Sequence, residues 1–121
     1  MILCADPSAQ FDSYQNEIEE AVLAVMRGNR YVLGEEVASL EKEFADYIET
    51  TSAIGVANGT DAIELALRAL DIGLGDEVIT VSHTAVATIA AIEATGADAV
   101  LVDEEPEYYT LNPNQLEEVF S

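Results

Sequence analysis

The run Asn58-Gly59-Thr60-Asp61-Ala62 stands where a short apolar segment gives way to apolar residues at helical spacing. A glycine-containing turn into a helix leaves backbone N–H groups pointing outward at the positive end of the helix dipole. Such groups bind phosphate, so Gly59, Thr60 and Asp61 are candidate contacts for a phosphorylated ligand. Helix capping is the alternative interpretation, because Asp61 followed by Glu64 fits a capping box. The two interpretations are compatible.

Polar residues follow each of three predicted strands, and in open α/β sheets that edge is where ligands bind. Asn58 to Asp61 follow the strand near 53–57, Ser82-His83-Thr84 follow 77–81, and Asp103-Glu104 follow 98–102. His83 can stack on a ring or exchange a proton near neutral pH. Alternatively, it caps the helix expected to begin at Thr84. We expect the carboxylates of residues 103–105 to form a solvated turn.

The alternation of apolar segments predicts an α/β fold, with a mostly parallel sheet and flanking helices. Helices over about 12–26, with Gly28 as the stop signal, and over 35–49 come first. The predicted order then continues with a strand near 53–57, a helix over 61–71, a strand near 77–81, a helix over 84–95, a strand near 98–102 and a helix from about Asn114. We therefore expect an amino-terminal helical segment, 1–50, followed by the incomplete first part of an α/β domain, 51–121.

The charge balance excludes some classes of function. The chain has 24 acidic residues against 4 basic ones, which gives a formal net charge of −20. Nucleic-acid binding is disfavoured, because it depends on lysine and arginine. Acid excess with Lys42 as the only lysine is typical of a protein from a high-salt cytoplasm, where screening relieves self-repulsion.

One cysteine and one histidine argue against a metal site. No segment predicts a membrane span or signal peptide, so a cytoplasmic location is expected.

Read in order, several segments resemble the amino-terminal part of the DegT/StrS family of pyridoxal-phosphate (PLP) sugar aminotransferases. They are Leu3 to Gln10, Arg30 to Gly34, Asn58 to Ala62, Gly75 to Ile79, Ser82 to Thr88, Gly96 to Asp103 and Leu111 to Pro113. The resemblance implies the first part of the large domain of a fold type I PLP-dependent transferase. It also implies a homodimer that moves an amino group from glutamate to a keto sugar linked to a nucleotide, in the biosynthesis of amino sugars and cell-surface polysaccharides.

The resemblance also implies roles for individual residues. In this family the turn matching Gly59, Thr60 and Asp61 contacts the PLP phosphate, and the segment matching 82–85 lies against the pyridine ring. Relatives usually carry an aromatic residue where Ala85 stands, and His83, on the same strand-like face, is the candidate to replace it.

The Schiff-base lysine of the family corresponds to a position beyond residue 121. Lys42 falls on an exposed helix position outside every matching motif. The resemblance therefore implies no catalytic residue in these 121 residues, and we expect this stretch alone to be inactive. Two alternatives remain: a non-catalytic α/β module that binds a phosphorylated ligand, and a family member with a regulatory role.

Overall fold

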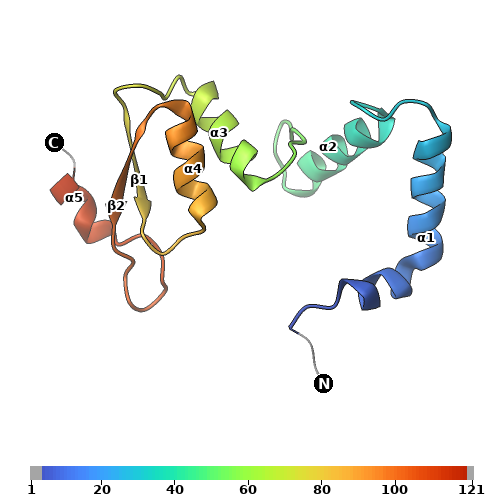
Figure 1. Cartoon of the computed structure of the whole chain (residues 1–121), viewed down its shortest axis with the longest axis horizontal. Coiled ribbons are helices and arrows are strands. Elements are labelled where there is room, and N and C mark those ends of the chain that lie inside the picture. The colour runs from blue at the N-terminus through green and yellow to red at the C-terminus, as the bar shows by residue number, and fades with distance from the viewer. Residues whose placement is uncertain (1–3, 120–121) are drawn as a thin grey trace. The chain divides into compact units, whose positions relative to one another are not determined.

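The computed structural model describes residues 4–119 and contains two compact units, Met1–Gly55 and Val56–Ser121. The first unit holds two helices, α1 (Pro7–Arg27) and α2 (Glu35–Tyr47). The second unit is an α/β unit (Figure 1) with α3 (Gly59–Ala69), β1 (Glu77–Val81), α4 (Val86–Thr95), β2 (Asp98–Val102), the 3-10 helix η1 (Pro113–Gln115) and α5 (Leu116–Val119). Among the described residues, no helix combines the length and apolar character needed to cross a bilayer.

Helix α1 begins earlier than the predicted 12–26, because its first turn has its own start signals. The Asp6 carboxylate accepts the N–H of Ala9 at 3.1 Å, and Pro7 occupies the first turn, where its missing N–H costs nothing. The helix is interrupted at Tyr14, whose φ of −125° is not helical. The neighbouring Ser13 hydroxyl donates to the Ala9 carbonyl at 2.9 Å, a bond that often bends helices.

The ends of both helices in the first unit follow from local backbone bonds. Helix α1 ends at Gly28, as predicted, and the Gly28 N–H bonds to the carbonyls of the preceding turn. Helix α2 ends before the predicted Glu49, because Glu49 takes the left-handed conformation with φ 57°. The N–H of Thr50 then bonds to the carbonyl of Ala45 at 3.0 Å, which closes the helix in a Schellman arrangement.

Strands β1 and β2 form a parallel pair, in which Glu77 lies opposite Asp98 and Val81 opposite Val102. Both strands have the predicted bounds, and α4 forms the crossover between them that a parallel pair requires. The core of this unit lies around α4, which packs against β2 and α3. Its buried apolar residues are Ala91, Ile92, Ala97 and Val102.

The predicted strand near 53–57 is wrong for the described chain, because residues 52–56 are irregular. A strand exists only where a neighbouring strand accepts and donates its ladder hydrogen bonds. The sheet of the described residues contains only β1 and β2, and the Gly55 N–H bonds instead to the Glu41 carboxylate at 2.8 Å. The apolar run therefore has the composition of a strand without the partner that would make it one.

The other helices of the second unit deviate by a few residues from the prediction. Helix α3 spans Gly59–Ala69 rather than 61–71, since Asp71 takes the left-handed conformation with φ 59°. Helix α4 begins at Val86 rather than Thr84 and ends at Gly96, whose φ is 91°. The predicted final helix begins as the 3-10 turn η1 and continues as α5.

Candidate functional site

The amino-terminal turn of α3 contains three of the predicted ligand contacts. The side-chain oxygen of Asn58 accepts the N–H of Asp61 at 2.9 Å, and the Asn58 carbonyl accepts the N–H of Ala62 at 3.1 Å. Within the described chain, the N–H groups of Gly59 and Thr60 have no hydrogen-bond acceptor. These two donors therefore remain available at the positive end of the helix dipole.

The capping box predicted at Asp61 and Glu64 is wrong. The helix begins at Gly59, so Asn58 occupies the N-cap position and supplies the capping oxygen. The Glu64 carboxylate instead accepts a hydrogen bond from Arg68 Nε at 2.8 Å, one turn along the same helix. The sequence contained the signal for this cap, because asparagine is among the most favoured N-cap residues.

The space beside this turn is open. A Cβ atom added to Gly59 would meet no heavy atom within 4 Å. The side chains of Thr60 and Asp61 are half-buried, and neither makes a hydrogen bond to another described residue. The turn thus combines two backbone donors with a free hydroxyl, a set that suits a phosphate oxygen.

His83 lies just beyond the carboxyl end of β1, with a largely exposed imidazole. Its Nδ1 is 3.3 Å from Oε1 of Glu104, which follows β2. The alternative in which His83 caps the next helix is wrong, because α4 begins at Val86 and its N-cap residue, Ala85, makes no side-chain cap. The imidazole therefore faces the end of the neighbouring strand.

The chain after β2 forms an ordered loop that holds Glu104 near His83. Glu104 forms an antiparallel bridge with Leu111. The N–H of Asp103 donates to the side-chain oxygen of Gln115 at 2.7 Å, which connects the strand end to η1. The turn predicted to be solvated is therefore hydrogen-bonded at its base, and Glu104 within it is half-buried.

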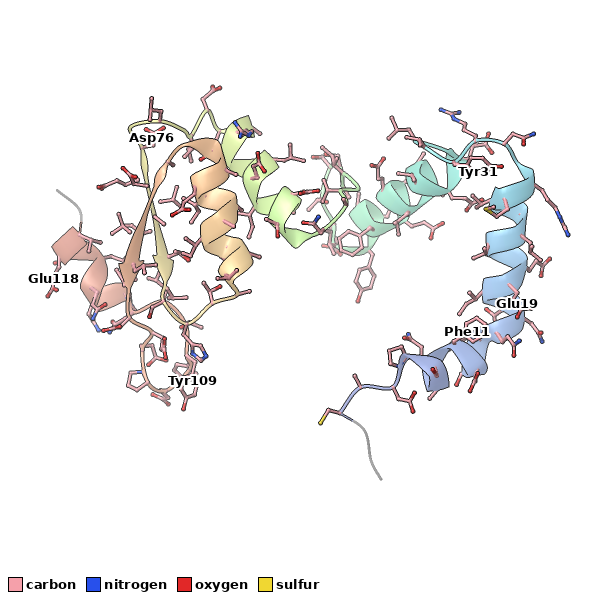
Figure 2. All side chains as sticks on the ribbon, viewed as in Figure 1. Phe11, Glu19, Tyr31, Asp76, Tyr109 and Glu118 are labelled. Carbon is pink, nitrogen blue, oxygen red and sulfur yellow. The ribbon has the colours of Figure 1, made fainter. Side chains whose placement is uncertain are left out.

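This loop and the two strand ends border an open surface hollow of about 570 Å³. Six residues line it: Ser82, His83, Asp103, Glu104, Pro106 and Tyr109. Figure 2 shows Tyr109 at the end of the α/β unit where both strands finish. No group of three or more histidine, cysteine, aspartate or glutamate residues in the described chain is arranged to hold a metal ion.

The start of α3 and the hollow lie at the same end of the α/β unit. Helices α3 and α4 pack against each other, and both begin at the end where β1 and β2 finish (Figure 1). This follows from the topology, because a helix that connects parallel strands runs opposite to them. The start of α3, His83 after β1 and Glu104 after β2 therefore lie at one end of the unit.

Lys42 has none of the properties of an activated amine. It lies on α2, its side chain is 77% exposed, and its ammonium group is 2.6 Å from the Asp46 carboxylate. The hydrogen bond to that carboxylate, and its negative charge, raise the pKa of Lys42 above the usual lysine value. A nucleophilic lysine needs the opposite change, a lowered pKa.

A parallel strand–helix–strand unit places this part of the chain among the α/β folds, in which ligands bind at the carboxyl ends of the strands. The chain belongs to the DegT/DnrJ/EryC1/StrS aminotransferase family, whose model matches residues 12–120.

Individual relatives agree with this assignment. The dTDP-3-amino-3,6-dideoxy-alpha-D-galactopyranose transaminase of Aneurinibacillus thermoaerophilus is 49% identical over 105 residues, which cover 87% of this chain and 29% of that protein. The crystal structure of S. venezuelae DesV in complex with a ketimine intermediate matches with a TM-score of 0.93 and 43% identity, over 96% of this chain and 31% of DesV. NtdA from Bacillus subtilis, solved with bound cofactor PMP, matches with a TM-score of 0.86 and 28% identity, over 90% of this chain and 25% of NtdA. The chain thus spans less than a third of the length of these relatives.

Sequence reasoning missed two residues of this edge. Glu104 was treated as part of a solvated turn, although it lies beside His83. Tyr109 lines the hollow, and nothing in its sequence context predicts it there. The Asn112-Pro113 pair marks where the next helical turn begins, but no sequence pattern places Glu104 or Tyr109 beside His83.

Proposed function

We propose that this chain is the amino-terminal portion of a PLP-dependent aminotransferase that acts on a keto sugar linked to a nucleotide. Such an enzyme would serve the biosynthesis of amino sugars and cell-surface polysaccharides. The family match over residues 12–120 and a relative named as a dTDP-sugar transaminase support this function. The observation that carries the proposal is the start of α3, where the N–H groups of Gly59 and Thr60 have no acceptor in the described chain.

These residues fit the phosphate group of PLP. The N–H groups of Gly59 and Thr60, together with the Thr60 hydroxyl, would donate to phosphate oxygens at the positive end of α3. Asp61 would keep these donors in place, because its own N–H is bonded to Asn58 in the first turn. His83 would lie against the pyridine ring. When bound, PLP supplies the electron sink that amino-group transfer requires.

The residue that holds PLP covalently is proposed to lie outside these 121 residues. Lys42 is the only lysine here, and its exposure and raised pKa disfavour it as a nucleophile. We therefore propose that these residues bind and orient the cofactor, and that the bare chain does not transfer amino groups.

The first test is the removal of one hydroxyl. Thr60→Val keeps the shape of the side chain but removes a donor to the phosphate, so binding of PLP to the chain should weaken by roughly tenfold or more. Thr51→Val is the matched control, because Thr51 lies in the other compact unit and should leave PLP affinity unchanged. Titration calorimetry measures both. Equal affinities for the two variants would reject the proposed phosphate site.

A second test addresses catalysis in the longer protein. If the aminotransferase proposal is correct, borohydride reduction of the PLP-loaded full-length protein fixes the cofactor on a lysine beyond residue 121, as peptide mapping would detect. If PLP binds without becoming fixed, the non-catalytic or regulatory alternative is favoured instead.

We further propose that the full-length protein is a cytoplasmic homodimer that uses glutamate as amino donor and works at high salt. The salt requirement rests on the 24 acidic residues, since few of the described ones have a cationic partner. The melting temperature should rise as potassium chloride is added, because screening weakens the repulsion between carboxylates. A melting temperature that is independent of salt would contradict this part of the proposal.

A further inference from the structure

We infer that Asn58 is a site of spontaneous deamidation, and that its conversion to aspartate or isoaspartate alters the turn that starts α3. Asparagine followed by glycine is the sequence in which this reaction is fastest, because glycine has no Cβ to obstruct the attack of its own nitrogen. Among the asparagines of the chain, only Asn58 precedes a glycine. The modification rests on this chain alone, whereas its effect on a bound phosphate rests on the proposed function.

The reaction needs no reagent except water. The Gly59 nitrogen attacks Cγ of Asn58, a C–N bond forms and the Cγ–Nδ2 bond breaks, so that ammonia leaves with the proton of the Gly59 N–H. One water molecule then opens the resulting succinimide ring. Opening at Cγ gives aspartate. Opening at the main-chain carbonyl gives isoaspartate, whose backbone contains an extra methylene group.

The attacking nitrogen is accessible. Within the described chain the Gly59 N–H has no acceptor, and a Cβ added to Gly59 would meet no heavy atom within 4 Å. Residues 57–59 are exposed and residues 52–56 are irregular, so Asn58 can rotate from its extended ψ of 176° until Cγ reaches the nitrogen. The positive end of the α3 dipole favours the nitrogen anion that forms when the attacking group loses its proton.

The Asn58 side chain is held by the hydrogen bond that caps the helix. Its Oδ1 accepts the N–H of Asp61 at 2.9 Å. During the attack, negative charge develops on this oxygen, and a donor that already points at it stabilises that charge. The bond that starts the helix therefore also activates Cγ of Asn58.

Deamidation changes the turn that we propose to bind phosphate. Aspartate can still cap the helix, but it adds a negative charge beside the N–H groups of Gly59 and Thr60. Isoaspartate displaces these N–H groups, because its backbone is longer. Both products should lower the affinity for a phosphate group. A bound phosphate would in turn occupy the Gly59 N–H and block the attack.

Peptide mapping by mass spectrometry measures the conversion. Cofactor-free full-length protein is incubated in mildly alkaline buffer, and the peptides that contain each asparagine are compared. Asn58 should convert roughly tenfold faster than Asn29, which is also exposed and outside a helix but precedes Arg30, a residue with a Cβ. Asn112 should not form a succinimide, because the nitrogen of Pro113 carries no proton. Conversion of Asn58 no faster than that of Asn29 would overturn the inference.

Two variants separate the chemistry from the capping role. Gly59→Ala should slow the conversion of Asn58 roughly tenfold, because the added Cβ obstructs ring closure although the turn has room for it. Asn58→Ser keeps a capping oxygen but has no amide to lose, so its PLP affinity should not decline during the incubation. The PLP affinity of the wild type should fall by roughly three- to tenfold once Asn58 is converted. Equal conversion rates in wild type and Gly59→Ala would reject the proposed reaction, and an undiminished PLP affinity of converted protein would reject its effect on the turn.

PLP itself distinguishes this inference from the proposed function. If both are correct, saturating PLP should slow the conversion of Asn58 roughly tenfold, because the bound form cannot react. Equally fast conversion with and without PLP would keep the deamidation site and reject the phosphate contact. PLP binding that weakens in Thr60→Val, in a protein whose Asn58 does not convert, would do the reverse.

Discussion

Helices α1 and α4 show that an apolar pattern and actual burial are different properties. Helix α1 carries apolar residues at helical spacing over 21 residues, and none of its residues is buried. Helix α4 has only 10 residues and is apolar nearly all round, and its Ala91 and Ile92 are almost completely buried. A stripe of apolar residues stabilises a helix only where another surface covers it. Within its own unit, α4 has such cover from α3 and β2.

The largest difference between the two helices should appear when a buried side chain is shortened. Ile92→Ala should lower the free energy of unfolding by about 3 kcal/mol, because Ile92 is 1% exposed and its removal leaves a cavity. The matched change on α1 is Val22→Ala, at a site that is 55% exposed, where the loss should stay below about 0.5 kcal/mol. Urea unfolding followed by circular dichroism measures both. Equal losses of unfolding free energy in the two variants would mean that another surface buries the apolar residues of α1 in solution.

A second contrast lies in the glycines that end the two helices. Gly96 after α4 has φ 91°, whereas Gly28 after α1 has an ordinary φ of −77°. Gly96→Ala should therefore destabilise by about 1–2 kcal/mol, because an alanine is strained in that conformation. Gly28→Ala should change stability by less than about 0.5 kcal/mol. Thermal unfolding of the two variants compares them directly. A loss of stability in Gly28→Ala as large as that in Gly96→Ala would contradict the ordinary φ of Gly28.

The smallest contrast concerns two ion pairs. Arg68 pairs with Glu64 and also donates to the carbonyl of Ala94, so it joins α3 to the last turn of α4. Lys42 pairs only with Asp46, on its own helix and in full contact with solvent. Arg68→Met should cost about 1 kcal/mol, and Lys42→Met should cost less than can be measured in most unfolding experiments.

The pH dependence of the Lys42 pair has a definite sign. Asp46 raises the pKa of Lys42 in the folded state, so any stabilisation is present at neutral pH and is lost as the pH rises through that raised pKa. A difference between wild type and Lys42→Met that grows at alkaline pH would contradict the assignment. Unfolding curves collected from neutral to strongly alkaline pH provide the comparison.

Much of the fold could be predicted because its signals are local. Strands 77–81 and 98–102 were predicted with their observed bounds from continuous apolar runs, and Gly28 was recognised as a stop signal. The start of α1 was predicted too late, although Asp6 and Pro7 are also local signals. The strand near 53–57 failed for a different reason, since strand formation needs a partner that composition does not supply.

The candidate site also has one part that the sequence predicted and one part that only the structure shows. The turn at Gly59, Thr60 and Asp61 was predicted from its sequence and from the family resemblance, and its role as a phosphate contact stays a prediction. The pairing of His83 with Glu104 joins residues at the ends of two different strands. It depends on the parallel register and on the loop after β2, neither of which has a local signal.

The sequence by itself determined the order of the helices, the strands at 77–81 and 98–102, the family, and the glycine turn that opens α3, because each of these depends on residues close together in the chain. Only the tertiary structure decided which apolar faces are covered, that the run at 53–57 is not a strand, and that Glu104 and Tyr109 share a hollow with His83. Those outcomes depend on surfaces and backbone partners brought together from distant positions. Burial and strand pairing are properties of that arrangement rather than of any one segment.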